Sequence, residues 1–197
     1  MLVLLRHGQT HSNVKRALDT KLPGAALTEL GQQQSRDVGP EIMDLYAPER
    51  IVTSEALRAR QTGHHAFGSL FDDIPAIAGL HEIAAGVHEM ATHDEALIEY
   101  HEVVHQFFTG DTNAMLTGGE NLETFLDRYR TGVEPLLEHT SVVVSHGSAI
   151  RTFAARATNV DPKFAQRAIL HNCRFVVLNP VGEFGQWELV RWGDEEL

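Results

Sequence analysis

The sequence predicts an α/β protein in which helices cover both faces of a mostly parallel central sheet, giving three layers, α/β/α. Two observations predict this fold. Continuously apolar runs, which are typical of strands buried on both faces, occur at 1–5, 50–54, 141–145 and 174–178. Segments with helical spacing of apolar residues lie between these runs. A fifth strand is expected at 186–192, where apolar and polar residues alternate as in an edge strand with one exposed face.

The helices are expected in five segments, at 29–38, 55–67, 94–108, 121–138 and 148–158. The first of them begins after Thr28, whose hydroxyl can cap a helix. The segment 94–108 carries its apolar side chains three and four residues apart, which is the spacing of one helix face. Because no repeat, low-complexity tract or linker interrupts the chain, we expect a single domain over 1–197.

Composition argues against several classes of protein. The chain has 16 Lys and Arg against 27 Asp and Glu, a net charge of −11, whereas nucleic-acid and anionic-membrane binding need a basic surface. No apolar run approaches the ~20 residues of a membrane span, and the N-terminal run is too short for a signal peptide. Cys173 is the single cysteine, which rules out an internal disulfide and suggests a core thiol. We expect a cytoplasmic protein without nucleic-acid or membrane partners, and a homodimer stays open.

One long stretch has an unusual charge distribution. Residues 61–127 contain no Lys or Arg, but 12 acidic residues and 7 of the 12 histidines. We interpret this stretch as an excursion over the sheet that forms a lid or a wall of a substrate site. The alternative is an acidic surface without functional meaning, which composition alone favours.

The residues that follow the buried strands point to an anion site. Arg6 and His7 follow the first strand, Arg58 comes shortly after the second, and His146 follows the third and precedes a helix. Ligands of open α/β sheets bind beyond the carboxyl ends of the strands, so these side chains would share one rim. Guanidinium groups match phosphate oxygens, helix N-termini attract anions, and an imidazole can attack phosphorus. The alternative is that they are ordinary polar residues at strand ends.

Six motifs occur in order along the chain: Arg-His-Gly-Gln-Thr at 6–10 with Asn13, Leu-Thr-Glu-Leu-Gly at 27–31, Ser-Glu-Ala-Leu-Arg-Ala-Arg-Gln-Thr at 54–62, Leu-His-Glu at 80–82, Gly-Gly-Glu at 118–120 and Ser-His-Gly at 145–147. In this order they resemble the histidine phosphatase superfamily, also called the phosphoglycerate mutase-like family. The resemblance covers essentially the full length. It implies a phosphoglycerate mutase-like fold with a helical excursion over the active site.

The resemblance also implies a role for each matching residue. His7 would be the nucleophile that is transiently phosphorylated. The phosphoryl oxygens would be bound by Arg6, Arg58, His146, Asn13 and Gly147. Glu82 would donate a proton to the leaving alcohol and later take one from the attacking water. No metal or other cofactor is implied, and the substrate would be a small phosphomonoester.

The acceptor of the phosphoryl group decides between two activities. Water gives a phosphatase, whereas a second hydroxyl gives a mutase, and mutases of the family typically carry basic residues in the excursion. Because 61–127 has no Lys or Arg, a doubly anionic sugar acid would meet a wall of 12 carboxylates, and we expect a phosphatase. A phosphoglycerate mutase-type transferase is the alternative, and a non-catalytic phosphate-binding protein is the alternative from another class. Residues 18–20, His88 and Met90 depart from the family pattern, so the natural substrate stays open. Asp19 is either a specific contact or a turn residue, and we expect the turn residue.

A rival motif lies within the excursion. His101-Glu102-Val103-Val104-His105 fits the His-Glu-x-x-His pattern of zinc proteases. Such a site needs a third protein ligand, for which Glu120 or Glu123 would be candidates, and Phe108 stands where the metzincin pattern requires Gly. We expect the flank of an amphipathic helix here, and no metal site.

Overall fold

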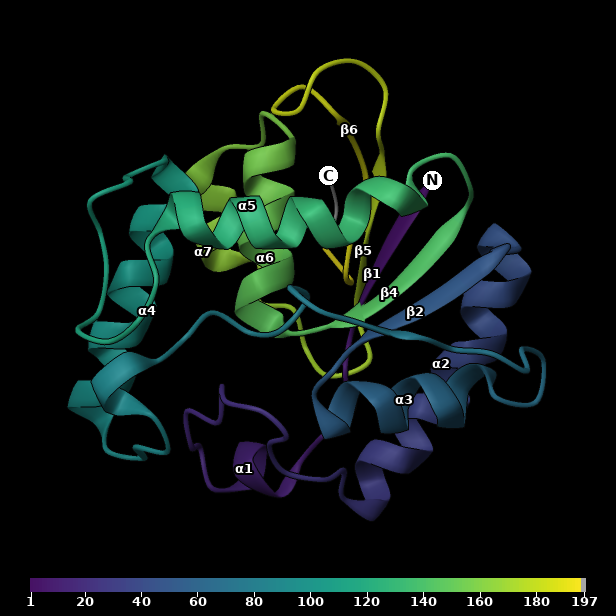
Figure 1. Ribbon diagram of the computed structural model, residues 1–197, viewed down its shortest axis with the longest axis horizontal. Coiled ribbons are helices and arrows are strands. Elements are labelled where there is room, and N and C mark those ends of the chain that lie inside the picture. Colours follow the sequence, from purple (N-terminus) through teal and green to yellow (C-terminus); the bar gives the residue numbers. More distant parts are fainter. Residues whose placement is uncertain (196–197) are drawn as a thin grey trace.

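The computed structural model describes residues 1–195 and has the expected α/β architecture, built on one six-stranded sheet in the order β3-β2-β4-β1-β5-β6 (Figure 1). The strands are β1 (Leu2–Arg6), β2 (Arg50–Ser54), β3 (Ala76–Ile77), β4 (Ser141–Ser145), β5 (Phe175–Asn179) and β6 (Glu188–Trp192). Five of them lie within two residues of their expected positions. The two-residue β3 is an addition, since a strand of that length leaves no pattern in the sequence.

The sheet is mostly parallel, with one reversed strand among those described. Strands β1, β4, β2 and β3 pair in parallel, whereas β5 is antiparallel to both β1 and β6. The residues before β5 therefore lie at the edge where β1, β2 and β4 end. The backbone N–H of Cys173, for example, donates to the carbonyl of Arg6 at 3.1 Å. Cys173 is buried as expected, and burial raises the pKa of its thiol to about 11.

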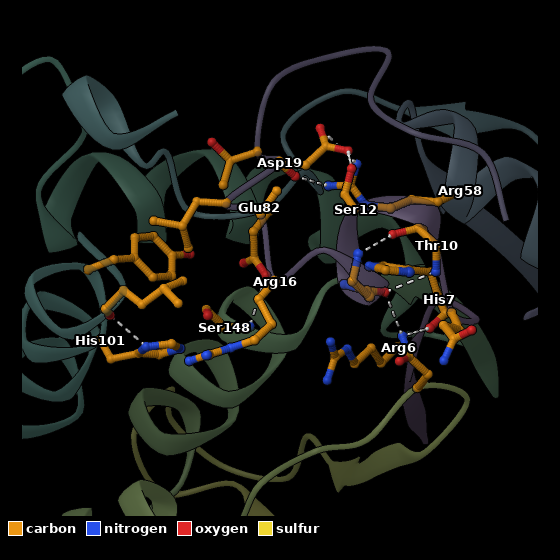
Figure 2. A pocket seen from close by; sticks show the side chains of 18 of the residues that line it. Arg6, His7, Thr10, Ser12, Arg16, Asp19, Arg58, Glu82, His101 and Ser148 are labelled. Atoms are coloured by element: carbon orange, nitrogen blue, oxygen red, sulfur yellow. Dashed lines mark hydrogen bonds and ion pairs between the residues drawn. The ribbon is translucent and has the colours of Figure 1, made fainter. Parts of the chain in front are cut away.

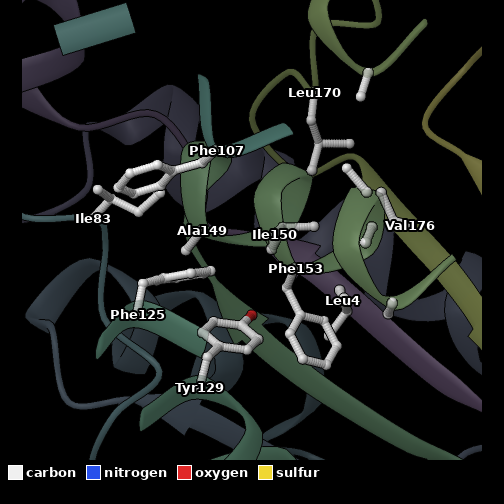
Figure 3. Close-up of a cluster of buried hydrophobic side chains, with 14 of the residues drawn as sticks. Leu4, Ile83, Phe107, Phe125, Tyr129, Ala149, Ile150, Phe153, Leu170 and Val176 are labelled. Carbon is white, nitrogen blue, oxygen red and sulfur yellow. The ribbon is translucent and has the colours of Figure 1, made fainter. Parts of the chain in front are cut away.

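The helices are α1 (His11–Val14), α2 (Glu29–Tyr46), α3 (Leu57–Phe67), α4 (Asp94–Thr109), α5 (Leu122–Val133), α6 (Gly147–Ala157) and α7 (Pro162–Arg167). Alternate residues of each strand divide the core into two layers, as the period of two in a strand requires. On one face, Val3 and Leu5 pack with side chains of α2 and α3. On the other, Leu4 and Val176 pack with the larger cluster from α4 to α7 (Figure 3).

Two helices differ in length from the expectation. Helix α2 continues eight residues beyond position 38, through Gly39 and Pro40, because Ile42 extends its buried face. A Cβ on Gly39 would lie 2.2 Å from the carbonyl oxygen of Ala66, so the missing side chain lets α2 and α3 pack closely. Helix α5 is shorter than the expected 121–138, since it ends at Val133 and a 3₁₀ turn follows over Glu134–Leu136.

The excursion from 61 to 127 includes β3, a 3₁₀ turn at Gly86–His88 and helix α4. Helix α4 packs on α6 and α7 and lies beside the sheet, opposite α2 and α3 (Figure 1). No helix within residues 1–195 combines the length and the apolar character that crossing a membrane requires.

Candidate active site

A cavity of about 930 Å³ opens at the carboxyl ends of the parallel strands (Figure 2). Its walls come from the end of β1, α1 and the loop after it, the start of α3, the excursion and the residues before β5. Five of the seven residues expected in the site line it: Arg6, His7, Asn13, Arg58 and Glu82. His146 and Gly147 lie behind this lining.

His7 stands at the end of β1 and is 4% exposed. Its Nδ1–H donates to the carbonyl of Gly8 at 2.7 Å, because a carbonyl can only accept, and this leaves a lone pair on Nε2. Burial, and then the positive charges of Arg58 and Arg6, hold the pKa of His7 well below its usual value. The imidazole is therefore neutral at pH 7, with the electron pair of Nε2 available for nucleophilic attack.

The N-terminus of α2 packs against the segment that follows His7. A Cβ on Gly31 would lie 2.1 Å from the carbonyl oxygen of Gln9, so this contact requires glycine. The N–H of Gly8 donates to the Thr62 hydroxyl at 3.0 Å. The segments 6–10, 27–31 and 54–62 thus meet around His7.

Arg6 and Arg58 bring two guanidinium groups to the cavity, and each keeps an unpartnered buried N–H. Nη1 of Arg6 donates to the carbonyl of Leu170 at 2.5 Å, and Nη2 of Arg58 to that of Asp19 at 3.0 Å. Nε of Arg6 and Nη1 of Arg58 have no hydrogen-bond partner within residues 1–195. Desolvation lowers the pKa of both side chains. Buried cationic donors beside an open cavity are suited to binding an oxyanion.

The space for Arg58 depends on a glycine. Gly24 has a φ of +71°, and a Cβ there would lie 2.2 Å from Nη1 of Arg58. The Asp19 carboxylate lies 3.9 Å from the same nitrogen. It also accepts hydrogen bonds from the Ser12 hydroxyl at 2.7 Å and the Ala25 N–H at 2.8 Å. Asp19, expected to be a turn residue, is therefore a specific contact that organises the loop around Arg58.

His146 and Gly147 support the arginines from behind. The His146 ring is fully buried, 5.2 Å from that of His7 between centroids. Its Nδ1 accepts from Nε of Arg58 at 3.2 Å, and its Nε2–H donates to the Ser54 hydroxyl at 2.9 Å. Burial and the nearby Arg58 hold the pKa of His146 well below its usual value, so this ring too is neutral. A Cβ on Gly147 would lie 3.2 Å from Nε of Arg6, so Gly147 makes room for that side chain.

Glu82 lines the cavity beside the N-terminus of α6. Its carboxylate accepts from the N–H groups of Ile83 at 2.9 Å, Ser148 at 3.0 Å and Ala149 at 2.7 Å. Helix N-termini stabilise negative charge, so α6 fixes the position of this carboxylate. Behind it, Arg128 donates to the carbonyls of residues 79, 81 and 82 and pairs with Glu120 at 2.6 Å. Glu120, within the Gly-Gly-Glu motif, thus helps to fix the segment that carries Glu82.

Asn172 is a site residue that the sequence did not reveal. Its amide donates to the carbonyl of His7 at 2.9 Å and to Oδ1 of Asn13 at 3.3 Å. Oδ1 of Asn13 also accepts from the Thr10 N–H at 3.1 Å, so the amide group of Asn13 is left to act as a donor. Asn172 precedes β5, and it reaches the site only because that strand is reversed. Asn172 could have been identified from the sequence only if the direction of β5 had been known.

The His-Glu-x-x-His motif lies on α4. Within residues 1–195, no three His, Cys, Asp or Glu side chains are grouped so as to hold a metal ion. Nδ1–H of His101 donates to the carbonyl of Leu97 at 2.7 Å, and Nδ1 of His105 accepts from the Gln166 amide at 3.0 Å. Both histidines flank the buried face of the helix, as expected, and both line the cavity.

The sequence profile of the histidine phosphatase superfamily (branch 1) matches residues 2–195. The chain belongs to this superfamily. It is an enzyme of the phosphatase and mutase type that the superfamily comprises. The match covers all six motifs and the parts of the fold that bring them together.

Three similar proteins illustrate the relationship. The chain is 26% identical over 174 residues, 86% of its length and 80% of the relative, to a protein of Erwinia tasmaniensis named "Probable phosphoglycerate mutase GpmB". It is 29% identical over 162 residues, 79% of its length and 78% of the relative, to the adenosylcobalamin/alpha-ribazole phosphatase of Salmonella typhimurium. A mycobacterial glucosyl-3-phosphoglycerate phosphatase has the same fold, with a TM-score of 0.80, 24% identity and 98% of each chain covered.

Proposed function

We propose that this enzyme hydrolyses small phosphomonoesters through a phosphohistidine intermediate on His7. One observation carries the proposal: a neutral, buried imidazole with a free Nε2 stands in the same cavity as two guanidinium groups that each keep an unpartnered buried N–H. A phosphoryl group would supply the missing acceptors. It would also bring its phosphorus within reach of the lone pair.

The reaction divides into two transfers at phosphorus. In the first, the Nε2 lone pair of His7 bonds to phosphorus, the bond to the alcohol oxygen breaks, and Glu82 in its protonated form gives that oxygen its proton and becomes a carboxylate. In the second, water attacks phosphorus, its proton passes to Glu82, and the bond to Nε2 breaks to release phosphate. Arg6 and Arg58 balance the charge on the transferring group in both steps. Because protein groups supply the nucleophile, the proton and the cationic charge, the scheme requires no metal or other cofactor.

The amide of Asn13 would bind a further phosphoryl oxygen. His146 holds Arg58 through Nδ1 in the structure, and a role for His146 at the phosphoryl group would require its ring to exchange the Ser54 hydroxyl for a substrate oxygen. Gly147 would contribute its backbone N–H from the start of α6.

Hydrolysis of an aryl phosphate tests the proposal. The wild type should hydrolyse the aryl phosphate in the presence of excess EDTA, and the kcat of His7→Ala should be lower by at least ~10³-fold. His64→Ala, which removes an exposed imidazole from α3, is the matched control and should keep full activity. Acid-labile, alkali-stable labelling of the wild type by the substrate should disappear with His7→Ala. An active His7→Ala variant, or activity abolished by EDTA, would contradict the proposal.

Transfer to a second alcohol separates the two superfamily activities. With a phosphoglycerate as both donor and acceptor, a mutase would interconvert positional isomers faster than it releases inorganic phosphate. We expect release of phosphate to dominate.

A further inference from the structure

Helix α4 turns two different faces toward the protein. Its buried face consists of Ala96, Tyr100, Val104, Phe107 and Phe108. A second face lines the cavity, with residues again three and four positions apart: Asp94, Leu97, Ile98, His101, Glu102 and His105. In Figure 2, His101 lies across the cavity from Arg6 and His7, with Arg16 between them. This second face therefore borders the space that remains when a phosphoryl group is bound at His7.

The charge on this second face depends on very few groups. Apart from Arg6 and Arg58, Arg16 is the one Lys or Arg among the described residues that line the cavity, and its Nη2 lies 3.0 Å from the Asp94 carboxylate. Glu102 makes no ion pair within residues 1–195. Burial and the nearby Arg151 lower the pKa of His105, so its ring adds no positive charge at neutral pH. Glu102 thus leaves the far side of the cavity negative.

The same wall also offers apolar contact. Leu97 and Ile98 line it together with Ala17 and Leu18 from the loop after α1. Ile98 is 56% exposed, so its aliphatic surface is accessible to a molecule bound in the cavity. An uncharged alcohol with some apolar surface would be complementary to this wall, whereas a carboxylate or a second phosphate would be repelled by Glu102.

We propose that the second face of α4 binds the alcohol part of the substrate, and that Glu102 discriminates against alcohols that carry an anionic group. The preferred substrates are then phosphate esters of uncharged, partly apolar alcohols. This inference rests on the proposed phosphatase function. It assigns substrate selection to one exposed side chain of the rival zinc motif.

Competition between two matched esters tests the inference. Glycerol 3-phosphate and 3-phosphoglycerate share a three-carbon skeleton, and they differ in having a hydroxymethyl group or a carboxylate. Their inhibition constants against aryl phosphate hydrolysis are measured at pH 8, where an ordinary imidazole is neutral, and at low ionic strength. The wild type should bind glycerol 3-phosphate at least roughly threefold more tightly. Glu102→Gln should bring the ratio of the two constants near one, and Glu102→Lys should reverse the preference.

Glu95 provides the matched control. It lies on α4, outside the cavity lining, and its side chain is 82% exposed. Glu95→Gln and Glu95→Lys make the same changes in net charge and should leave the ratio unchanged. High salt should shrink the effect of the Glu102 variants, since exposed charges are screened.

The outcomes separate the two proposals. An equal ratio in the wild type, an equal response to Glu95→Lys and Glu102→Lys, or failure of both esters to compete would overturn the role of Glu102 and α4, with the phosphatase function intact. Absence of aryl phosphate hydrolysis by the wild type would instead overturn the proposed function itself.

Discussion

Glu89 connects the excursion, to which it belongs, with the loop after α1, which forms one wall of the cavity. Its carboxylate accepts from the N–H of Thr20 at 2.9 Å, from the N–H of Lys21 at 3.1 Å and from the Thr20 hydroxyl. Two backbone hydrogen bonds between residue 18 and residues 90 and 91 run beside it. The carbonyl of Asp19, within this loop, accepts from Arg58. Removal of Glu89 should therefore lower stability and loosen Arg58 without touching the reacting atoms.

The size of the effect follows from the three hydrogen bonds. Hydrogen bonds to a charged acceptor contribute about 1.5–3 kcal/mol each, and water can replace the exposed one at Lys21. The two remaining bonds indicate that Glu89→Ala should lower the free energy of unfolding by about 3–6 kcal/mol. Glu89→Gln keeps an oxygen for the two N–H groups but leaves the Thr20 hydroxyl without an acceptor, so about 1–2 kcal/mol is expected. That hydroxyl oxygen already accepts from the Ala85 N–H at 3.0 Å.

Urea unfolding followed by fluorescence of the buried Trp187 and Trp192 measures the stability, and kcat/KM for esters with good and poor leaving groups measures the catalytic effect. Because Glu89 does not line the cavity, its variants should lower both kcat/KM values by the same factor. If the free energy of unfolding of Glu89→Ala lies within about 0.5 kcal/mol of the wild-type value, Glu89 does not stabilise the contact between the loop after α1 and the excursion. A loss concentrated on poor leaving groups would show that Glu89 takes part in proton transfer, and would contradict the assignment of Glu82 as the proton donor.

Four further predictions concern the site itself. Glu82→Gln should slow hydrolysis about 10²–10⁴-fold for alkyl phosphates and much less for an aryl phosphate with a good leaving group; equal losses would remove Glu82 from the donor role. The lowered pKa of His7 keeps its imidazole neutral below pH 6.5, so the acid limb of kcat/KM attributable to this ring should lie well below pH 6.5; a limb centred at 6.5 that His64→Ala leaves in place would contradict this. Below pH 6.5 the unfolded chain takes up protons at His7 and His146 that the folded chain does not. The free energy of unfolding should therefore decrease as the pH is lowered, which urea titrations at several pH values would record. Asn172→Ala should weaken competitive inhibition by inorganic phosphate about threefold to tenfold, whereas Asn172→Gln should recover part of the loss if the amide positions Asn13.

The sequence predicted the strands and the polar side chains that meet at their carboxyl ends, because both depend on local patterns. Buried strands need continuous apolar runs, and ligands gather where parallel strands end, so Arg6, His7 and Arg58 could be expected at one rim. An apolar run does not reveal the direction of its strand, since a buried strand has the same composition whether it is parallel or antiparallel to its neighbours. The reversed β5, and with it Asn172, therefore required the structure.

The hydrogen-bond partners of the site residues were also beyond the sequence. His146 could be expected near the phosphoryl group from its motif, but its contacts with Arg58 and Ser54 depend on side-chain rotamers in a packed interior. Likewise, aspartate is common in turns, so the sequence alone favours a turn at Asp19. Its contacts with Ser12, Ala25 and Arg58 arise because the loop after α1 folds over the start of α3.

The charge of the excursion shows most clearly what three-dimensional placement adds to composition. A wall of 12 carboxylates was expected to repel anionic substrates, yet Glu82, Asp94 and Glu102 are the only three of the 12 that line the cavity. Glu82 is held by backbone N–H groups of α6, and Asp94 is paired with Arg16. The other nine carboxylates lie outside the lining: most are exposed, so water and salt screen them, and Glu120 is paired with Arg128. If the enzyme rejects anionic alcohols, the selectivity should therefore respond to Glu102 alone, whereas a rejection caused by overall charge would respond equally to Glu95.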